Sequence, residues 1–216
     1  MRYLVQSIAQ GWSPECESHP WSEDEWAVLK LGSVNHGVFV PAENKRLPSD
    51  LEPRPDITVR EGDVVMSRAN TRQLVGSAAV VPRDYPRLML SDLLYRLRVK
   101  RPLVLPEYVA SVLGSGPLRA EIELRAKGTS HSMQKISRSD ILELRLPTPP
   151  LEEQVRRQAL VRENTARVDA MINKARESIA LMKERRAALI SAAVTGRIDV
   201  RTGIEQVERD LEEARA

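Results

Sequence analysis

Two short segments of the chain concentrate arginine, lysine and amide side chains. Residues 67–73 follow an apolar run and hold two arginines, an asparagine and a glutamine within six positions. Residues 125–135 combine basic residues with a glycine and small hydroxyl side chains. Arginine matches the acceptors of guanine, asparagine or glutamine matches adenine, and lysines and hydroxyls bind phosphate oxygens. These segments supply the candidate DNA-binding residues, which are Arg68, Asn70, Thr71, Arg72, Lys127, Thr129, Ser130, His131, Gln134 and Lys135.

Part of this set has a structural alternative. Asn70 and Thr71 can build a local turn by bonding to neighbouring backbone groups, without touching a ligand. A third basic spot, residues 44–46, is more typical of a solvated turn. Arg96 and Arg98 alternate along an apparent strand, and this pattern predicts a solvent-exposed face.

Side chains that could carry catalysis do not form a recognisable group. The acidic candidates for metal ligation are scattered along the chain: Asp56, Asp63, Asp84 and Asp92. Cys16 and His19 are close in sequence, but one thiol–imidazole pair is weak support for a nucleophilic site. His36 and His131 have no evident metal-ligating neighbours, and no glycine-rich phosphate loop or methyltransferase cofactor motif is present. We therefore predict no catalytic residues, no metal and no cofactor.

The composition is that of a folded protein with a mild basic excess. Hydrophobic residues make up 42% of the chain, and 33 lysines and arginines against 30 acidic residues give a net charge of +3. That charge alone is weak support for nucleic-acid binding, because the distribution of charge matters more than its sum. The single cysteine excludes an internal disulfide, and no apolar run approaches the roughly 20 residues that span a bilayer. We expect a soluble cytoplasmic protein.

The elements that must position these side chains divide near Pro150. All prolines and all aromatic residues lie at or before that position. Runs rich in β-branched residues and bounded by turn residues predict strands, at residues 26–31, 37–40, 63–67 and 77–81. Helices are expected at residues 106–113, 118–124 and 138–144, the last with Ser137 or Ser139 as its cap. The globular part is therefore predicted to be a mixed α+β domain.

A long helix follows a proline-rich hinge. Proline fixes φ and disfavours helix before it, so the helix should begin at Leu151 or Glu152 and end near Gly196. A seam with the alternating four- and three-residue spacing of a coiled coil includes Val161, Val168, Ile172, Ala175, Ile179, Met182 and Leu189, with Thr165 as its one polar and Arg186 as its one charged member. Such a seam needs a partner helix, and we expect a second copy. The alternative is that the helix folds back on the globular domain.

Three motifs in the hinge and helix resemble type I restriction–modification specificity subunits. Residues 147–154 (PTPPLEEQ) are similar to the family junction P-x-P-P-L-x-E-Q, and residues 165–172 (TARVDAMI) resemble its T-x-x-I-D-x-L-I stretch. Residues 183–196 (KERRAALISAAVTG) resemble its L-K-E-R-R-x-A-L-I-S-x-A-V-T-G ending. Globular segments that include residues 11–14 and 67–71 are similar to one large class of target recognition domains.

The resemblance implies a division of labour among subunits. In this family, target domains read two DNA half-sites, and long helices fix the distance between them and dock methyltransferase (M) subunits. A separate motor–endonuclease (R) subunit cleaves. Members usually carry two target domains and two helices, so this chain corresponds to half of a subunit. The open alternative is a coiled-coil adaptor whose head binds protein without DNA readout.

The expected organisation follows from the hinge and from the resemblance. Residues 1–146 would form the DNA target recognition domain, residues 147–196 the hinge and dimerisation helix, and residues 197–216 a polar tail. The expected partners are double-stranded DNA, M subunits, the R subunit and a second copy of the chain, with no membrane. The predicted fold class is α+β, namely a mixed α/β target recognition domain followed by one long coiled-coil α-helix.

Overall fold

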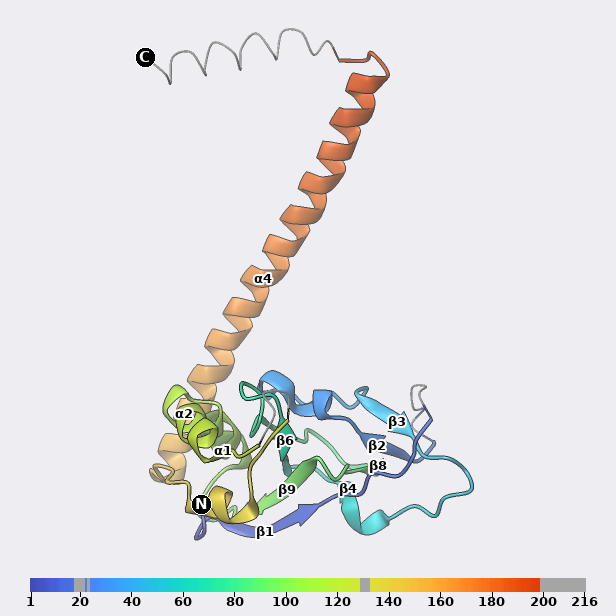
Figure 1. Cartoon of the computed structure of the whole chain (residues 1–216). Coiled ribbons are helices and arrows are strands. Elements are labelled where there is room, and N and C mark those ends of the chain that lie inside the picture. Colours follow the sequence, from blue (N-terminus) through green and yellow to red (C-terminus); the bar gives the residue numbers. More distant parts are fainter. Residues whose placement is uncertain (18–21, 23, 129–132, 199–216) are drawn as a thin grey trace. The chain divides into compact units, whose positions relative to one another are not determined.

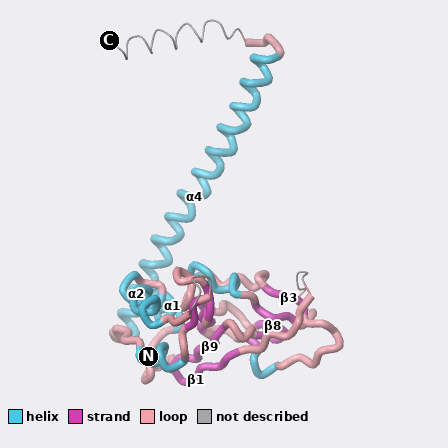
Figure 2. The backbone as a smooth tube through the Cα atoms, viewed as in Figure 1, coloured by secondary structure: helices cyan, strands magenta, loops and turns pink. Residues whose placement is uncertain are grey.

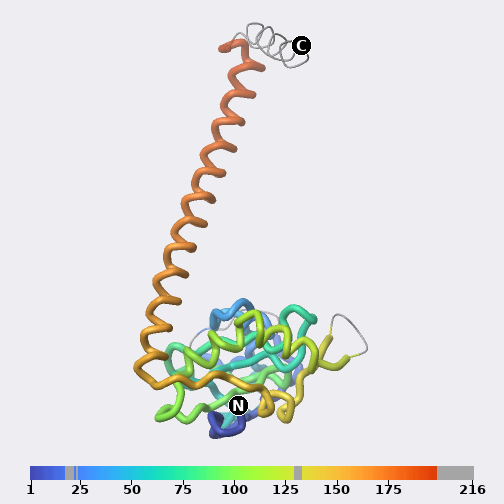
Figure 3. The backbone as a smooth tube through the Cα atoms, turned by 90° about the vertical axis from the view of Figure 1, so that its left-hand side faces the viewer, coloured from blue at the N-terminus to red at the C-terminus, as the bar shows by residue number. Residues whose placement is uncertain are grey.

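The computed structural model describes residues 1–17, 22, 24–128 and 133–198. The chain divides into two compact units, Met1–Ala159 and Leu160–Ala216. The first unit combines strands with short helices, and the described part of the second is mostly one long helix (Figures 1, 2 and 3). The predicted α+β class, with a long helix at its C-terminal side, is confirmed.

Two four-stranded sheets form the body of the first unit. Their strands are β1 (Val5–Gln10), β2 (Ala27–Leu29), β3 (Asn44–Arg46), β4 (Thr58–Val59), β5 (Val64–Ser67), β7 (Ala78–Val80), β8 (Tyr85–Met89) and β9 (Leu94–Val99). One sheet has the order β1-β9-β5-β7 and is antiparallel throughout. The other has the order β3-β2-β8-β4, in which only β2 and β8 are parallel. The predicted strand segments 26–31, 63–67 and 77–81 contain β2, β5 and β7.

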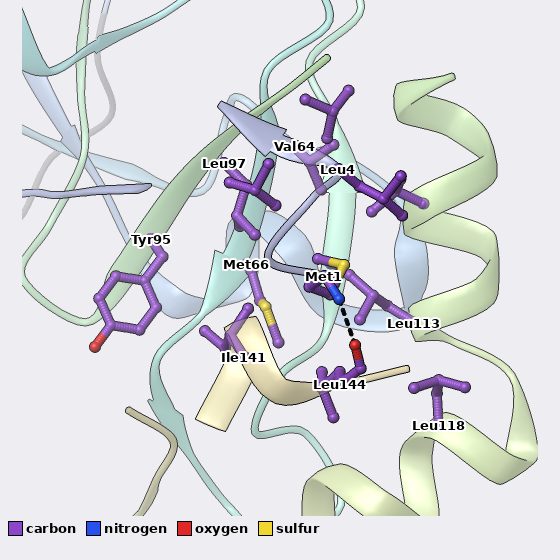
Figure 4. Close-up of a cluster of buried hydrophobic side chains, with 14 of the residues drawn as sticks. Met1, Leu4, Val64, Met66, Tyr95, Leu97, Leu113, Leu118, Ile141 and Leu144 are labelled. Carbon is purple, nitrogen blue, oxygen red and sulfur yellow. Dashed lines mark hydrogen bonds between the residues drawn. The ribbon is translucent and has the colours of Figure 1, made fainter. Parts of the chain in front are cut away.

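Strand β5 supplies side chains to two hydrophobic cores. Val64 and Met66 are fully buried in one core, and Val65 is fully buried in the other. Successive side chains of a strand point to opposite faces, so a strand covered on both faces is apolar at every position. This explains the continuous apolar run in the sequence. Figure 4 shows Val64 and Met66 among side chains of the first core that come from the N-terminal segment, from β9 and from the helices.

Three short helices line the first core, namely α1 (Pro106–Leu113), α2 (Gly116–Arg125) and α3 (Arg138–Glu143). Proline lies in the first turn of α1 and of α2. Backbone N–H groups there have no acceptor within the helix, so the N–H that proline lacks is not missed. Ser137 caps α3, because its hydroxyl accepts a hydrogen bond from the Asp140 N–H at 3.1 Å. In return, the Asp140 carboxylate accepts from the Ser137 N–H at 3.1 Å. The three predicted helices are confirmed, and Ser137 is the cap.

The fourth helix, α4 (Leu151–Val194), begins within the first unit. Gln154 in its first turn is completely buried. The Gln154 side-chain oxygen accepts from the Leu105 N–H at 2.9 Å, and its amide donates to the carbonyls of Leu103 at 3.2 Å and Pro149 at 2.8 Å. One glutamine therefore satisfies three backbone groups where the hinge meets the start of α1.

One turn later, Gln158 is also buried, and its side chain accepts from the Ser111 hydroxyl at 3.0 Å. Gln154 and Gln158 continue the four- and three-residue spacing of the seam back from Val161. The stripe is polar and hydrogen-bonded within the first unit and mostly apolar in the second, where Thr165 and Arg186 are its polar members. At its far end the helix ends at Val194, and Gly196 just beyond it has the φ of +70° typical of a left-handed cap, so the predicted start and stop are confirmed.

The expected strand at residues 37–40 is wrong. Residues Leu31–Gly37 form a 3-10 helical segment, η1, and a second one, η2, spans Pro55–Ile57. Gly37 has a φ of +78°. Val38 after it has an extended backbone, with φ of −110° and ψ of 131°, but residues 38–40 pair with no described strand, and the Val38 side chain is exposed.

The expectation that Arg96 and Arg98 lie on a solvent face is also wrong for Arg96. Its side chain is buried, lies 3.9 Å from the Asp63 carboxylate and donates to the Asp56 carbonyl at 3.1 Å. Burial lowers the pKa of Arg96, and the neighbouring Arg98 lowers it further. Arg98 is partly exposed and bonds to Asp63 at 3.0 Å. Arg96 is covered because its face of the first sheet meets η2 and β4, where its guanidinium donates to the carbonyls of Asp56 and Thr58.

Candidate nucleic-acid interface

The two basic segments singled out from the sequence lie side by side (Figure 1). Strand β6 (Ala69–Asn70) pairs antiparallel with β10 (Gln134–Lys135). Lys135 of β10 also exchanges two backbone hydrogen bonds with Lys127, each of 2.9 Å. We call the described part of this structure, residues 68–73, 127–128 and 133–135, the recognition ribbon. Folding therefore joins two candidate segments that are distant in sequence.

The base of the recognition ribbon is fixed to the first sheet. Arg68 directly follows β5, and its N–H donates to the Leu93 carbonyl at 2.8 Å. On its other side, the Arg68 carbonyl accepts from the Ile136 N–H at 3.0 Å. The Arg68 guanidinium donates to the Asp92 carbonyl at 3.2 Å, so this side chain is turned toward the loop before β9. Arg68 thus connects β5, β9 and the strand partner of β6.

Helix α2 supports the turn that follows β6. The Arg119 guanidinium donates to the carbonyls of Val75 at 2.6 Å and Gln73 at 3.0 Å. Burial lowers the pKa of Arg119, although the nearby carboxylate of Glu123 acts in the opposite direction. Gly76 has a φ of +75°, and a Cβ there would lie 2.7 Å from the Ile122 side chain. The turn therefore requires glycine and is held against α2.

Burial divides the candidate residues of the first segment. Asn70 is buried, its amide donates to the Asn35 side-chain oxygen at 3.4 Å, and its own oxygen accepts from the Thr71 N–H at 2.8 Å. This is the local bonding that the structural alternative describes. Thr71 and Arg72 are exposed, and Arg72 lies 3.5 Å from the carboxylate of Glu123. The first segment therefore presents Thr71 and Arg72 to solvent.

The second segment presents two lysines. Lys127 and Lys135 are exposed, whereas Gln134 is half-buried and donates to the Gly128 carbonyl at 3.2 Å. Thr129, Ser130 and His131, which the sequence also singles out, lie outside the described residues. Among the candidate residues, the exposed groups are thus the Thr71 hydroxyl and the Arg72 guanidinium on one segment and the ammonium groups of Lys127 and Lys135 on the other.

The seam of α4 is exposed in the single chain. The exposed fractions of its large side chains are 46% for Val161, 48% for Val168, 41% for Ile172, 50% for Ile179, 62% for Met182 and 50% for Leu189. Ala175 is exposed as well. Single exposed apolar residues are ordinary on protein surfaces, but a regular stripe of them marks an interaction surface.

The described residues add little that favours catalysis. Among them, no group of three or more histidine, cysteine or acidic side chains is placed to hold a metal ion. Burial raises the pKa of the Cys16 thiol, which disfavours the reactive thiolate. His19, its neighbour in sequence, lies outside the described residues. No helix in the described ranges is long and apolar enough to cross a bilayer.

The sequence interpretation missed two structural contributions. Asn35 bonds to Asn70, yet nothing local in the sequence links η1 to the ribbon. The buried pair Gln154 and Gln158 had a detectable signal, because extending the seam spacing toward the hinge places both glutamines on the same stripe.

Comparison with known proteins gives a consistent result. No protein-family model matches the chain. It is 29% identical over 154 residues to the specificity subunit of the type I restriction enzyme EcoEI from Escherichia coli. The alignment covers 71% of this chain and 26% of that subunit, so the chain spans about a quarter of its curated relative.

Two solved structures share the fold. A chain from a study of complex assembly and conformational transition in the type I R-M system superposes with a TM-score of 0.62 at 22% identity, over 86% of this chain and 42% of that one. The HsdS subunit from Thermoanaerobacter tengcongensis superposes with a TM-score of 0.56 at 20% identity, over 88% and 48%. The chain therefore has the fold of an HsdS subunit over somewhat less than half of such a protein, which confirms the resemblance to type I restriction specificity subunits.

Proposed function

We propose that this chain is a DNA sequence-recognition subunit of a type I restriction–modification system. It reads one half-site and directs methyltransferase and endonuclease subunits to DNA, and it is not itself an enzyme. The observation that carries the proposal is the recognition ribbon, where two basic segments pair in a chain that is similar to a type I specificity subunit. The chemistry then belongs to the partner subunits.

Burial suggests separate roles for the residues of the ribbon. Lys127 and Lys135 are exposed ammonium groups suited to neutralising phosphates. Thr71 and Arg72 are exposed candidate residues of the first segment, and arginine is suited to the acceptors of guanine. Asn70, which is buried and bonded within the protein, shapes the turn that presents them.

The proposal includes a homodimer formed through the exposed seam of α4. A two-fold pair presents two identical heads, so it reads an inverted repeat with a fixed gap. The test is the mass in solution, measured by size-exclusion chromatography with light scattering. The wild-type chain should be a dimer at micromolar concentration, Ile179→Asp should be a monomer, and Asn173→Asp, which lies outside the seam, should remain a dimer. A monomeric wild-type chain would contradict this part of the proposal.

The main test is methylation mapping in cells that express the chain with its cognate methyltransferase. We expect adenine methylation at a palindromic motif split by one gap length, and a lower methylated fraction for the Lys127→Gln/Lys135→Gln double variant. An asymmetric motif would reject the homodimer. Methylation no different from that of cells with the methyltransferase alone would reject the recognition function.

The exposed seam also fits a second candidate, a coiled-coil adaptor whose head binds protein. Salt dependence separates the two, because a protein that neutralises phosphates releases counterions from DNA. For a recognition subunit in complex with its methyltransferase, the logarithm of the affinity for duplex DNA should fall steeply with the logarithm of salt concentration. An adaptor would show no such binding.

A further inference from the structure

We propose that residues 35–38 form a third DNA-reading segment, in which His36 and Val38 determine part of the sequence specificity. The inference rests on the proposed recognition function, since it requires a duplex on the recognition ribbon. The inference adds residues that lie outside both basic segments. A search for clustered charged and amide side chains does not find them.

The segment lies next to the recognition ribbon. The Asn35 side-chain oxygen accepts a hydrogen bond from the buried amide of Asn70 at 3.4 Å, which joins η1 directly to β6. Helix η1 also packs against β5 and β7 of the first sheet. In Figure 1, η1 is the blue coil beside the label of β6. A duplex that contacts Thr71 and Arg72 therefore lies close to residues 35–38.

The segment is closed and firmly anchored. Ser33 and Val34, just before it, are fully buried. The Val40 N–H donates to the Ser33 carbonyl at 2.9 Å, which closes the loop across the segment, and the Ser33 hydroxyl donates to the Lys30 carbonyl at 2.7 Å. A reading element needs this kind of preorganisation, because ordering a flexible loop would weaken binding.

The backbone of the segment is strained at its tip. His36 has φ of 60° and ψ of 23°, and in the described part of the chain it is the one non-glycine residue with positive φ. Gly37 follows with φ of +78°. Such strain concentrates at functional sites, and no described hydrogen bond of the His36 ring accounts for it. The two left-handed residues turn the chain so that His36 and Val38 are both exposed, Val38 by 62%.

The two side chains suit the edge of a base pair. A histidine ring offers a hydrogen-bonding nitrogen that can meet a base acceptor or donor, and an apolar side chain such as valine can contact the methyl group of thymine. An exposed aliphatic side chain such as that of Val38 makes no hydrogen bonds to water. If His36 and Val38 face the major groove, both side chains would discriminate among bases at one or two positions of the half-site.

The test compares motifs methylated by variants of the full chain with its cognate methyltransferase. His36→Gly removes the ring but keeps the left-handed backbone, and Val38→Ser removes the apolar group. Tyr3→Ser is the matched control, because Tyr3 is also a large exposed side chain, at 81%. We expect both variants to keep the gap and most positions of the motif, and to methylate sites changed at one or two positions about tenfold more, relative to the cognate site.

Each other outcome is decisive. An unchanged motif in both variants, with cognate methylation equal to that of Tyr3→Ser, would overturn the inference. Uniformly weaker methylation without a change in base preference would show a supporting role and would also overturn it. Loss of co-purification with the methyltransferase would assign the segment to a protein contact instead. If the wild-type chain yields no split motif, the proposed function itself fails, and this inference fails with it.

Discussion

Replacing Gln154 by leucine should destabilise the first unit strongly. The side chain is completely buried and satisfies the Leu105 N–H and the carbonyls of Leu103 and Pro149. Leucine fills a similar volume but leaves three backbone groups without this partner. A buried donor or acceptor without a partner costs about 1–3 kcal/mol, and carbonyls tolerate the loss better than the N–H. We therefore expect Gln154→Leu to lower the free energy of unfolding by about 3 kcal/mol.

The measurement is urea unfolding followed by tryptophan fluorescence. All three tryptophans precede Ala27, so the signal reports on the first unit. A loss of about 3 kcal/mol is a large part of the 5–15 kcal/mol typical of a domain, and it should lower the midpoint without changing the slope. In a thermal scan it corresponds to a fall of about 6–12 °C in Tm.

Asn173→Leu is the matched control. It makes the same kind of change, an amide to leucine, on the same helix at an exposed position. Its effect should stay within about 0.5 kcal/mol. Protein concentration must be equal in all samples, because association through the seam would add to the apparent stability. A loss below about 0.5 kcal/mol for Gln154→Leu would refute the idea that its three hydrogen bonds matter.

Three further predictions concern the ribbon and its supports. Gly76→Ala should lower stability by about 1–3 kcal/mol in the same urea assay, because a Cβ would meet Ile122 at 2.7 Å and φ is +75°. The hydrogen bond from Ser137 lowers the pKa of Asp140 below its usual 3.8. The ionised Asp140 therefore stabilises the fold at pH values above about 4, and this contribution is lost as the pH falls through the lowered pKa. When the free energy of unfolding is measured from pH 7 to pH 2, Asp140→Asn should show a smaller loss of stability with acid than the wild-type chain. Lys135→Gln should reduce the slope of log affinity against log salt by about 1 for duplex binding by the complex with methyltransferase, with the methylated motif unchanged; an unaltered slope would remove Lys135 from the phosphate contacts.

The sequence predicted the elements whose signals are local. The β-branched runs located β5 and β7, proline marked the start of α1, and the hinge and the left-handed glycine bounded α4. These signals depend on a few neighbouring residues, so one chain suffices to detect them. The motifs of the hinge and helix likewise revealed the relationship to specificity subunits.

The missed features depend on contacts between distant segments. Strands β6 and β10 have two residues each, too short for a periodic pattern, and their pairing joins the region after β5 to the region before α3. Arg96 is buried because the segment Asp56–Thr58 covers its face of the sheet, and alternation along one strand cannot reveal such a distant cover. Val38 follows two left-handed residues, and its apolar character suggested a strand where the chain is extended but has no strand partner among the described residues.

The double role of β5 separates what must stay constant from what can change. Its side chains fill two cores, so nearly every substitution in Val64–Ser67 would disturb folding. One residue further on, the chain enters a ribbon held by a two-residue pairing, with exposed side chains at its tip. Mutations there should alter what is recognised at little expense in stability. The architecture therefore favours evolvability: new specificities can arise by exchanging the ribbon segments, and grafting them between related chains should transfer target preference.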